Sequence, residues 1–274
     1  MNAVSHFQHS REALAKEALL LARVARRESD FEMALWTAGR SLVVPSSMAR
    51  KPRFESAASA SAAGGWPVVL RPSGGGVVPQ GPGILNLAIV SVADGKECQD
   101  PVAYFQVLTD LIASAVTRTG AVSVGPVNGS FCDGKFNVAV DGRKLAGTAQ
   151  RWTIRNARSH EYAVLAHATI LCAADIPASC AAVEYFCGEL GEPIPLDPDA
   201  HINLQEVLSN DTDAFAHCAG IFRAHLLGGN YAVCKRGLES QTAKSQSFLC
   251  DSGGRAALKR AVAETEGFEP SIPR

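Results

Sequence analysis

The sequence lacks three features that would assign it quickly to a class. It has no run of about 18 apolar residues, so nothing in it predicts a membrane-spanning helix. Its 26 basic and 27 acidic side chains nearly balance, and a chain without a basic surplus is not typical of a nucleic-acid-binding protein. It has no Cys-x-x-Cys pair, so no metal site is expected. Membranes, nucleic acids and structural zinc are therefore the partners that we expect least.

The cysteines also carry no pairing pattern. The eight of them stand at positions 98, 132, 172, 180, 187, 218, 234 and 250, scattered through a chain too long for a disulfide scaffold. The first residues show neither the charged nor the apolar region of a secretory signal. We therefore expect a cytoplasmic protein with free thiols. With 47% hydrophobic and 19% charged residues, the chain is able to bury a sizeable core.

One segment, residues 125–152, stands out for its chemistry. Phe136–Val140 alternates in the manner of a strand, and Asp141-Gly142 is a strong signal for a hairpin turn. Lys144 then begins the returning strand, 12 residues after Cys132. This spacing predicts that the loop containing Cys132 folds back toward the ammonium of Lys144.

An ammonium close to a thiol favours the reactive thiolate. Cys132 and Lys144 therefore form a candidate nucleophilic site. On spacing alone, however, the structural explanation is the more common one, because most free cysteines are small buried hydrophobes and most lysines near turns are solvated.

A second glycine-rich segment lies between two predicted strands, residues 66–70 and 84–90. It reads Arg71-Pro-Ser73-Gly74-Gly75-Gly76. Three consecutive glycines allow close approach of a ligand, with backbone N–H groups available to an anion or a carbonyl. A flexible hairpin loop would give the same pattern, so both interpretations stay open.

The remaining periodicity predicts a mixture of helices and strands. A strand pair is expected at 33–36 and 41–44, joined around Gly39, and an apolar strand at 162–174, in which we expect His167 to be a structural residue. Residues 45–65, rich in alanine and serine, are expected to form an irregular surface loop. Helices are predicted at residues 10–28, 101–117, 175–192, 204–207, 212–227 and 255–266.

Taken together, the two glycine-marked segments resemble the lipoate–protein ligase, octanoyltransferase and biotin–protein ligase superfamily. The first, Arg71-x-Ser73-Gly-Gly-Gly76 with Gly83-x-Leu-Asn86, resembles its acyl-binding loop and following strand. The second, Asp141-Gly-Arg-Lys144-Leu-Ala-Gly147-Thr-Ala-Gln150-Arg, resembles its lysine motif. The resemblance covers about residues 10–175.

The resemblance implies an α+β fold of the class II synthetase type, with a mixed, largely antiparallel sheet flanked by helices. We expect one catalytic domain over residues 1–274. Its core would span about residues 10–190, and residues 191–274 would be a C-terminal helical extension.

Within the superfamily, Gly129-Ser-Phe-Cys132-Asp-Gly134 is most similar to the octanoyl-transferring amidotransferase branch, in which a cysteine carries the acyl group as a thioester. Two features depart from that branch: Asp133 replaces a proline, and the triple glycine is more like the ligase branch. The resemblance implies that Cys132 is the nucleophile and that Lys144 orients the acyl carbonyl. The acyl- and substrate-binding residues that it implies are Arg71, Ser73, Gly74, Gly75, Gly76, Asn86, Gly147, Thr148 and Ala149.

The implied activity is transfer of an octanoyl or lipoyl group, without a cofactor, onto a lysine of a lipoyl-type carrier domain. The implied carriers are the glycine cleavage H protein and the acyltransferase subunits of 2-oxoacid dehydrogenases. We expect an apolar slot for the acyl chain, lined by Trp36, Val77, Val78 and Leu85.

Two alternatives remain open. One is a lipoate–protein ligase that needs ATP and Mg²⁺ and acts through an acyl-adenylate, in which Lys144 holds the adenylate oxygens and Cys132 is a bystander. The other is a non-catalytic protein that binds lipoate or a lipoyl domain. The presence of Cys132 together with Lys144 favours the transferase.

Overall fold

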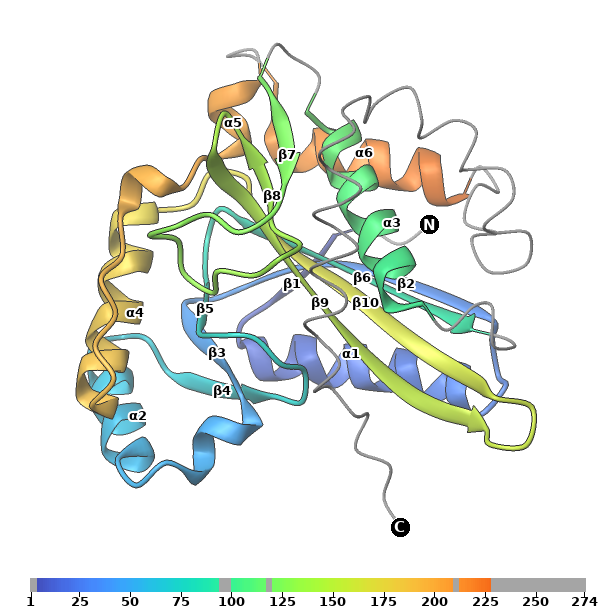
Figure 1. Cartoon of the computed structure of the whole chain (residues 1–274), viewed down its shortest axis with the longest axis horizontal. Helices are drawn as coiled ribbons and strands as arrows, with labels where there is room; N and C mark the ends of the chain where they lie inside the picture. The colour runs from blue at the N-terminus through green and yellow to red at the C-terminus, as the bar shows by residue number, and fades with distance from the viewer. Residues whose placement is uncertain (1–3, 94–99, 117–119, 209–211, 228–274) are drawn as a thin grey trace. The chain divides into compact units, whose positions relative to one another are not determined.

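The computed structural model describes residues 4–93, 100–116, 120–208 and 212–227, and a seven-stranded sheet lies at its centre (Figure 1). In spatial order the strands are β1 (Ser5–Phe7), β2 (Phe31–Ala38), β6 (Ile84–Ala93), β10 (Glu161–Leu171), β9 (Arg143–Asn156), β8 (Val138–Val140) and β7 (Val122–Val124). β1 and β2 pair in parallel, and every other neighbouring pair is antiparallel. The predicted mixed, largely antiparallel sheet is confirmed.

Helices flank this sheet on both faces, as an α+β fold requires (Figure 1). The α-helices are α1 (Ser10–Ala25), α2 (Phe54–Ala63), α3 (Pro101–Ser114), α4 (Ile176–Leu190), α5 (Leu204–Val207) and α6 (Ala214–Leu227), with 3-10 turns η1 (Ser46–Arg50) and η3 (Pro198–Ala200). The predicted helices at residues 10–28, 101–117, 175–192, 204–207 and 212–227 are therefore confirmed, with ends that differ by a few residues. The predicted helix at 255–266 lies outside the described residues.

The central strands are apolar on both sides because both faces of the sheet are covered. In β6, Leu85 and Leu87 pack toward α3 and α6, while Ala88 and Val90 pack toward α1. β2 and β10 alternate in the same way. This period of two is the one that strand geometry imposes, and it distributes the buried side chains between two cores.

A smaller, three-stranded sheet contributes to a third core. Its strand composition shows that one predicted strand pair is wrong. It consists of β4 (Val68–Arg71), β3 (Ser41–Pro45) and β5 (Val78–Gln80). The expected hairpin between residues 33–36 and 41–44 is therefore wrong, because the two strands lie in different sheets. The reason is that β1 occupies the free edge of β2: Gly39 donates its backbone N–H to the carbonyl of Phe7, and the chain then leaves the large sheet.

Residues 45–65 are not the irregular loop that we expected. η1 and α2 occupy most of this segment, since alanine has the highest helix propensity of all residues. Phe54, at the start of α2, packs edge-to-face on Phe186 of α4 with ring centroids 6.3 Å apart. This alanine-rich segment is thus a helix with one buried face.

The segment after α4 contributes to the main core. Its apolar side chains join the cluster between the large sheet and α3. They are Ile202, Leu204, Leu208, Ala214, Cys218, Ala219, Phe222 and Leu226. The division into a core at 10–190 and an extension at 191–274 stays a prediction. In the described part of the chain, no helix is long and apolar enough to cross a membrane.

Candidate active site

Cys132 lies where the two glycine-marked segments meet. It occupies the predicted loop before β8, and its thiol sulfur is 3.0 Å from the backbone nitrogen of Gly76, which donates a hydrogen bond to it. Its backbone φ is +49°, in the left-handed region that costs a non-glycine residue about 1 kcal/mol or more. The sequence placed both loops correctly, but it gave no sign that they touch.

The glycines are required because the two loops approach so closely. A Cβ on Gly75, whose φ is +99°, would lie 3.1 Å from the sulfur of Cys132 and 3.0 Å from Nη2 of Arg71. A Cβ on Gly76 would lie 3.2 Å from the Cα of Cys132. Side chains at either position would clash with Cys132, so these glycines allow the close approach of the cysteine loop, whereas the sequence had suggested the close approach of a ligand.

Arg71 holds the glycine loop in shape from the inside. Its Nη2 donates to the carbonyl oxygens of Gly74 at 2.8 Å and Gly76 at 2.7 Å, and its Nη1 donates to the carbonyl of Val43 at 2.7 Å. Burial lowers the pKa of Arg71, and the neighbouring Cys132 opposes that shift. The guanidinium is thus a buried positive charge beside the thiol.

Lys144 is fully buried, with 2% of its surface exposed, although it follows a turn. The turn itself is the predicted hairpin, with Asp141 and Gly142 both at positive φ. The register between β8 and β9 shifts beside Lys144, so that Ala139 pairs with Lys144 and Val138 with Ala146. Such a bulge re-aims side chains, and here consecutive residues 144 and 145 are both buried.

The ammonium of Lys144 faces the backbone of the cysteine loop. Its Nζ donates to the carbonyl oxygen of Phe131 at 2.5 Å and to that of Cys132 at 2.9 Å. Burial lowers the pKa of Lys144 to about 8, while Cys132 and Asp133 partly oppose the shift. A lysine with this pKa is able to exchange its proton near neutral pH.

Asp133 stands where the resemblance leads us to expect a proline, and it makes two hydrogen bonds within its loop. Its carboxylate accepts from the backbone N–H of Val127 at 2.6 Å and from the side-chain amide of Asn137 at 3.2 Å. A proline would restrict the loop through its ring, whereas Asp133 restricts it by fastening both ends. The sequence marked Asp133 as a departure, and Asn137 was missed.

The other predicted residues divide into two groups. Gly147 lies beside Lys144, since a Cβ there would be 3.5 Å from Nζ. Thr148 uses its hydroxyl to hold the carbonyl of Phe136 at 2.8 Å. Asn86 is buried in a reciprocal amide pair with Gln80 and accepts from Thr169, and Ala149 pairs with His167 across β9 and β10. No described contact joins these last two to Cys132.

Two serine hydroxyls of the site are buried without partners. Among the residues that the structure describes, the Oγ atoms of Ser73 and Ser130 are solvent-inaccessible and make no hydrogen bond. Ser73 was predicted to bind substrate and Ser130 was not singled out. Orphaned buried hydroxyls are rare and need an explanation, and both belong to the loops that carry the thiol and the glycines.

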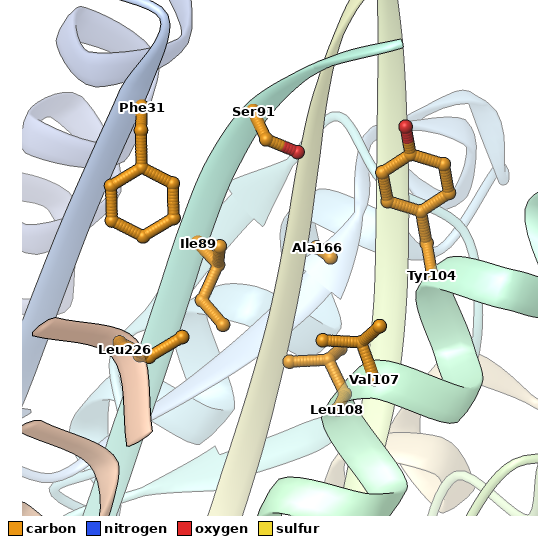
Figure 2. Close-up of a pocket in the computed structure, with 8 residues that line it drawn as sticks. All are labelled: Phe31, Ile89, Ser91, Tyr104, Val107, Leu108, Ala166 and Leu226. Carbon is orange, nitrogen blue, oxygen red and sulfur yellow. The ribbon is translucent and has the colours of Figure 1, made fainter. Parts of the chain in front are cut away.

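The predicted apolar slot is wrong in its lining. Trp36, Leu85 and Val77 belong to three different cores, because adjacent residues of a strand face opposite sides of the sheet. Figure 2 shows a separate apolar cavity between Phe31 of β2, Tyr104 and Leu108 of α3 and Leu226 of α6. Its volume is about 20 Å³, which is room for about one water molecule.

Comparison with known proteins identifies the family. Residues 9–212 match the lipoyl protein ligase A/B catalytic domain. An uncharacterised protein of Cupriavidus necator is 41% identical over 150 residues, which are 51% of this chain and 59% of that protein. An octanoyl-GcvH:protein N-octanoyltransferase of Kyrpidia tusciae is 36% identical over 111 residues, which are 39% of this chain and 38% of the relative. Each match therefore covers less than two thirds of the relative's own length.

The fold comparison agrees with the sequence comparison. A crystal structure of lipoate-protein ligase A bound with ATP superimposes with a TM-score of 0.53 at 15% identity, covering 82% of this chain and 86% of that one. At this identity the likeness establishes the fold alone. Because the family match extends over residues 9–212, the chain belongs to the lipoyl protein ligase A/B catalytic domain family.

Proposed function

We propose that the protein moves an octanoyl or lipoyl group between lysines of lipoyl-type carrier domains through a thioester on Cys132. The observation that carries the proposal is the thiol itself. It sits in a strained backbone conformation, receives a hydrogen bond from Gly76 and adjoins two buried cations, Arg71 and Lys144. An adenylating ligase has no use for such a thiol.

In the first half of the reaction the Cys132 thiolate attacks the amide carbonyl of the acylated donor lysine. A C–S bond forms, the C–N bond breaks, and the donor amine leaves with a proton. In the second half the acceptor amine attacks the thioester carbonyl, loses its proton, and expels the thiolate. One amide replaces another, so no net proton, electron or nucleotide is consumed.

Both tetrahedral intermediates carry an oxyanion that needs donors. The Lys144 ammonium and backbone N–H groups of the Gly74–Gly76 loop are the donors that we assign. Each such donor is worth about 10²–10³ in rate. The pKa of Lys144, about 8, also suits it to supply the proton of the leaving amine and to recover it from the incoming one.

The roles of the other predicted residues follow from this assignment. Arg71 keeps the glycine loop in shape, Ser73 offers a free buried hydroxyl to the substrate, and Gly147 and Thr148 support Lys144 and the loop. We propose the cytoplasm as the compartment, consistent with five free cysteines in the described part of the chain. No cofactor is needed for this transfer.

The test is transfer of octanoate from an octanoylated H protein to an unmodified carrier domain of a 2-oxoacid dehydrogenase, without ATP. We expect acceptor acylation with the wild-type protein and none with Cys132→Ala. Cys187→Ala is the matched control, because Cys187 is also a free cysteine but lies on the buried face of α4.

A second arm supplies free octanoate or lipoate with ATP and Mg²⁺. Acceptor acylation only in this arm, and undiminished in Cys132→Ala, would contradict the proposal and favour the ligase. Acylation in neither arm, with tight binding of an acylated carrier, would favour the non-catalytic binding protein.

A further inference from the structure

The segment between α4 and α5 clasps the loop that carries Cys132. The backbone N–H of Asp197 donates to the carbonyl of Gly129 at 2.9 Å, and the N–H of Ile202 donates to the carbonyl of Lys144 at 2.9 Å. Gly129 is itself at φ +81°, and a Cβ there would lie 3.1 Å from the Cβ of Asp197. Residues 197–202 therefore bridge the cysteine loop and the strand of Lys144.

The side chain of His201 hydrogen-bonds to the loop. It is buried, with 2% exposed, and its Nε2 accepts the backbone N–H of Phe131 at 3.2 Å. Its ring also stacks on the ring of Phe131, with centroids 4.4 Å apart and planes 23° apart. His201 thus contacts both the backbone and the ring of Phe131, the residue before Cys132.

The hydrogen bonds fix the tautomer of His201. Because Nε2 accepts, the proton of the neutral ring belongs on Nδ1, which faces the carbonyl of Asp197 at 3.0 Å. Both nitrogens are therefore occupied, and neither is free to take a proton from Cys132. Burial lowers the pKa of His201 to about 4, so the ring keeps its acceptor throughout the neutral range.

The peptide groups around Phe131 are consequently held from two directions. His201 holds its N–H and Lys144 holds its carbonyl oxygen. The following residue, Cys132, is at φ +49°, and such a conformation persists only when its surroundings over-determine it. Without His201 the loop would relax, and the thiol would move from the N–H of Gly76.

We propose that His201 is a positioning residue for the Cys132 nucleophile, acting through Phe131. This inference rests on the proposed acyl transfer. His201 makes no contact with the sulfur; it sets the orientation of the peptide that presents it. The resemblance to the family implied no role for this position.

The test compares two substitutions of His201 with a neighbouring control. His201→Phe keeps an aromatic ring against Phe131 but removes the acceptor, and His201→Gln supplies an amide oxygen as acceptor. Cys180→Ala is the control, since its sulfur lies 3.8 Å from Nδ1, on the side of the imidazole away from the Phe131 N–H. For each variant we would measure Tm, kcat and KM for the acylated carrier, and the pH profile of iodoacetamide alkylation at Cys132.

We expect His201→Phe to lower kcat about 10²-fold, the cost of a small displacement of a reacting group, with KM within about twofold. Its alkylation profile should shift, because Gly76 no longer meets the sulfur. His201→Gln should recover at least part of the loss, and Cys180→Ala should match the wild type in kcat and in alkylation.

Two results would overturn the inference. One is a folded His201→Phe with wild-type kcat and wild-type alkylation. The other is a similar loss of kcat in His201→Phe and His201→Gln that parallels a fall in Tm, while the alkylation profile stays unchanged. That result would mark His201 as a purely structural residue. If the wild-type protein transfers nothing without ATP, the proposed function fails, but the alkylation profiles still decide whether His201 positions the thiol.

Discussion

Two buried polar clusters of this protein differ in how completely they are satisfied. Under α1, Glu17 accepts a hydrogen bond from the indole of Trp36 at 2.8 Å, and its other carboxylate oxygen lies 3.0 Å from Nδ1 of His167. Around Cys132, by contrast, two hydroxyls lack partners, Cys132 itself has a positive φ, and the ammonium of Lys144 donates hydrogen bonds to two neutral carbonyl oxygens.

The contrast separates a structural cluster from a site. The Glu17 cluster joins α1 to the sheet, and both carboxylate oxygens of Glu17 have a counterpart, which is the normal state of a buried group. The Cys132 site retains unpaired hydroxyl groups and a strained backbone conformation. Such strain persists in proteins chiefly at functional sites. The histidines show the same division: His167 bonds to Glu17 of α1, whereas His201 bonds to the loop that carries Cys132.

Among the changes considered, Lys144→Met should have the largest effect on the Cys132 site. Losing the ammonium should lower kcat about 10²–10³-fold. The same change removes a buried charge whose pKa is about 8 instead of 10.5, so we expect the free energy of unfolding at pH 7 to rise by about 1 kcal/mol, after the lost hydrogen bonds are subtracted. Chemical denaturation and the ATP-free transfer assay would measure the two effects.

The pH dependence of that gain has a definite sign. A lysine whose pKa is lowered on folding destabilises the native state while it is charged, and the penalty disappears as pH rises from about 8 to 10.5. The stability advantage of the variant should therefore shrink over this range and then reverse, because the variant still lacks the hydrogen bonds of Lys144. A variant that is less stable than the wild type at pH 7 would contradict the assignment of a costly buried ammonium.

Glu17→Ala should break the other cluster with the opposite result. It leaves the Trp36 indole and the His167 ring without their partner, so we expect a loss of about 2–3 kcal/mol in the free energy of unfolding and a kcat within about twofold of the wild type. Glu17→Gln, which keeps both hydrogen bonds available, is the control. A large loss of kcat in folded Glu17→Ala would erase the distinction between the clusters.

Raising the pH should weaken the transferase by a smaller amount. Lys144 loses its proton around pH 8, so kcat should fall about fivefold between pH 8 and 9 as the cation disappears. The same profile measured with Lys144→Arg should move this fall to higher pH or remove it, because the guanidinium stays charged. A wild-type kcat that is constant up to pH 10 would argue against a role for the ammonium.

The smallest expected effect is that of Ser130→Ala on stability. The hydroxyl is buried without a partner, so its removal should leave the free energy of unfolding unchanged or raise it by up to about 1 kcal/mol. Ser41→Ala is the contrasting control, because Ser41 shares a buried hydrogen bond with Ser10 at 2.6 Å. That variant should lose about 1 kcal/mol in the free energy of unfolding. Thermal unfolding of the two variants side by side would test the difference.

Local patterns in the sequence predicted most of the elements but not how they meet. The hairpin at Asp141-Gly142 and the helices follow from turn chemistry and periodicity, and they are confirmed. The hairpin expected around Gly39 failed because strand pairing depends on β1, which lies far upstream. The irregular loop expected over residues 54–63 is wrong because an alanine-rich segment forms a helix when one of its faces can be buried.

The site was predicted in the same unequal way. Cys132, Lys144 and the glycine loop were found because short motifs carry them. His201 was missed because it acts through the backbone of Phe131, 70 residues away, and no spacing in the sequence records that contact. Arg71 was predicted to bind substrate, which stays a prediction; its hydrogen bonds to the glycine loop and to Val43 of β3 are revealed only by the tertiary structure.

The proposed thioester places the acyl group on Cys132. The most direct measurement is mass spectrometry of the intact protein and its peptides after incubation with an octanoylated carrier domain and no ATP, followed by treatment with hydroxylamine. We predict one octanoyl group on the peptide that contains Cys132, removed by hydroxylamine because thioesters are cleaved by it, and no adduct on Cys132→Ala. An unmodified wild-type protein that nevertheless acylates an acceptor, or an adduct that persists in Cys132→Ala, would contradict the account.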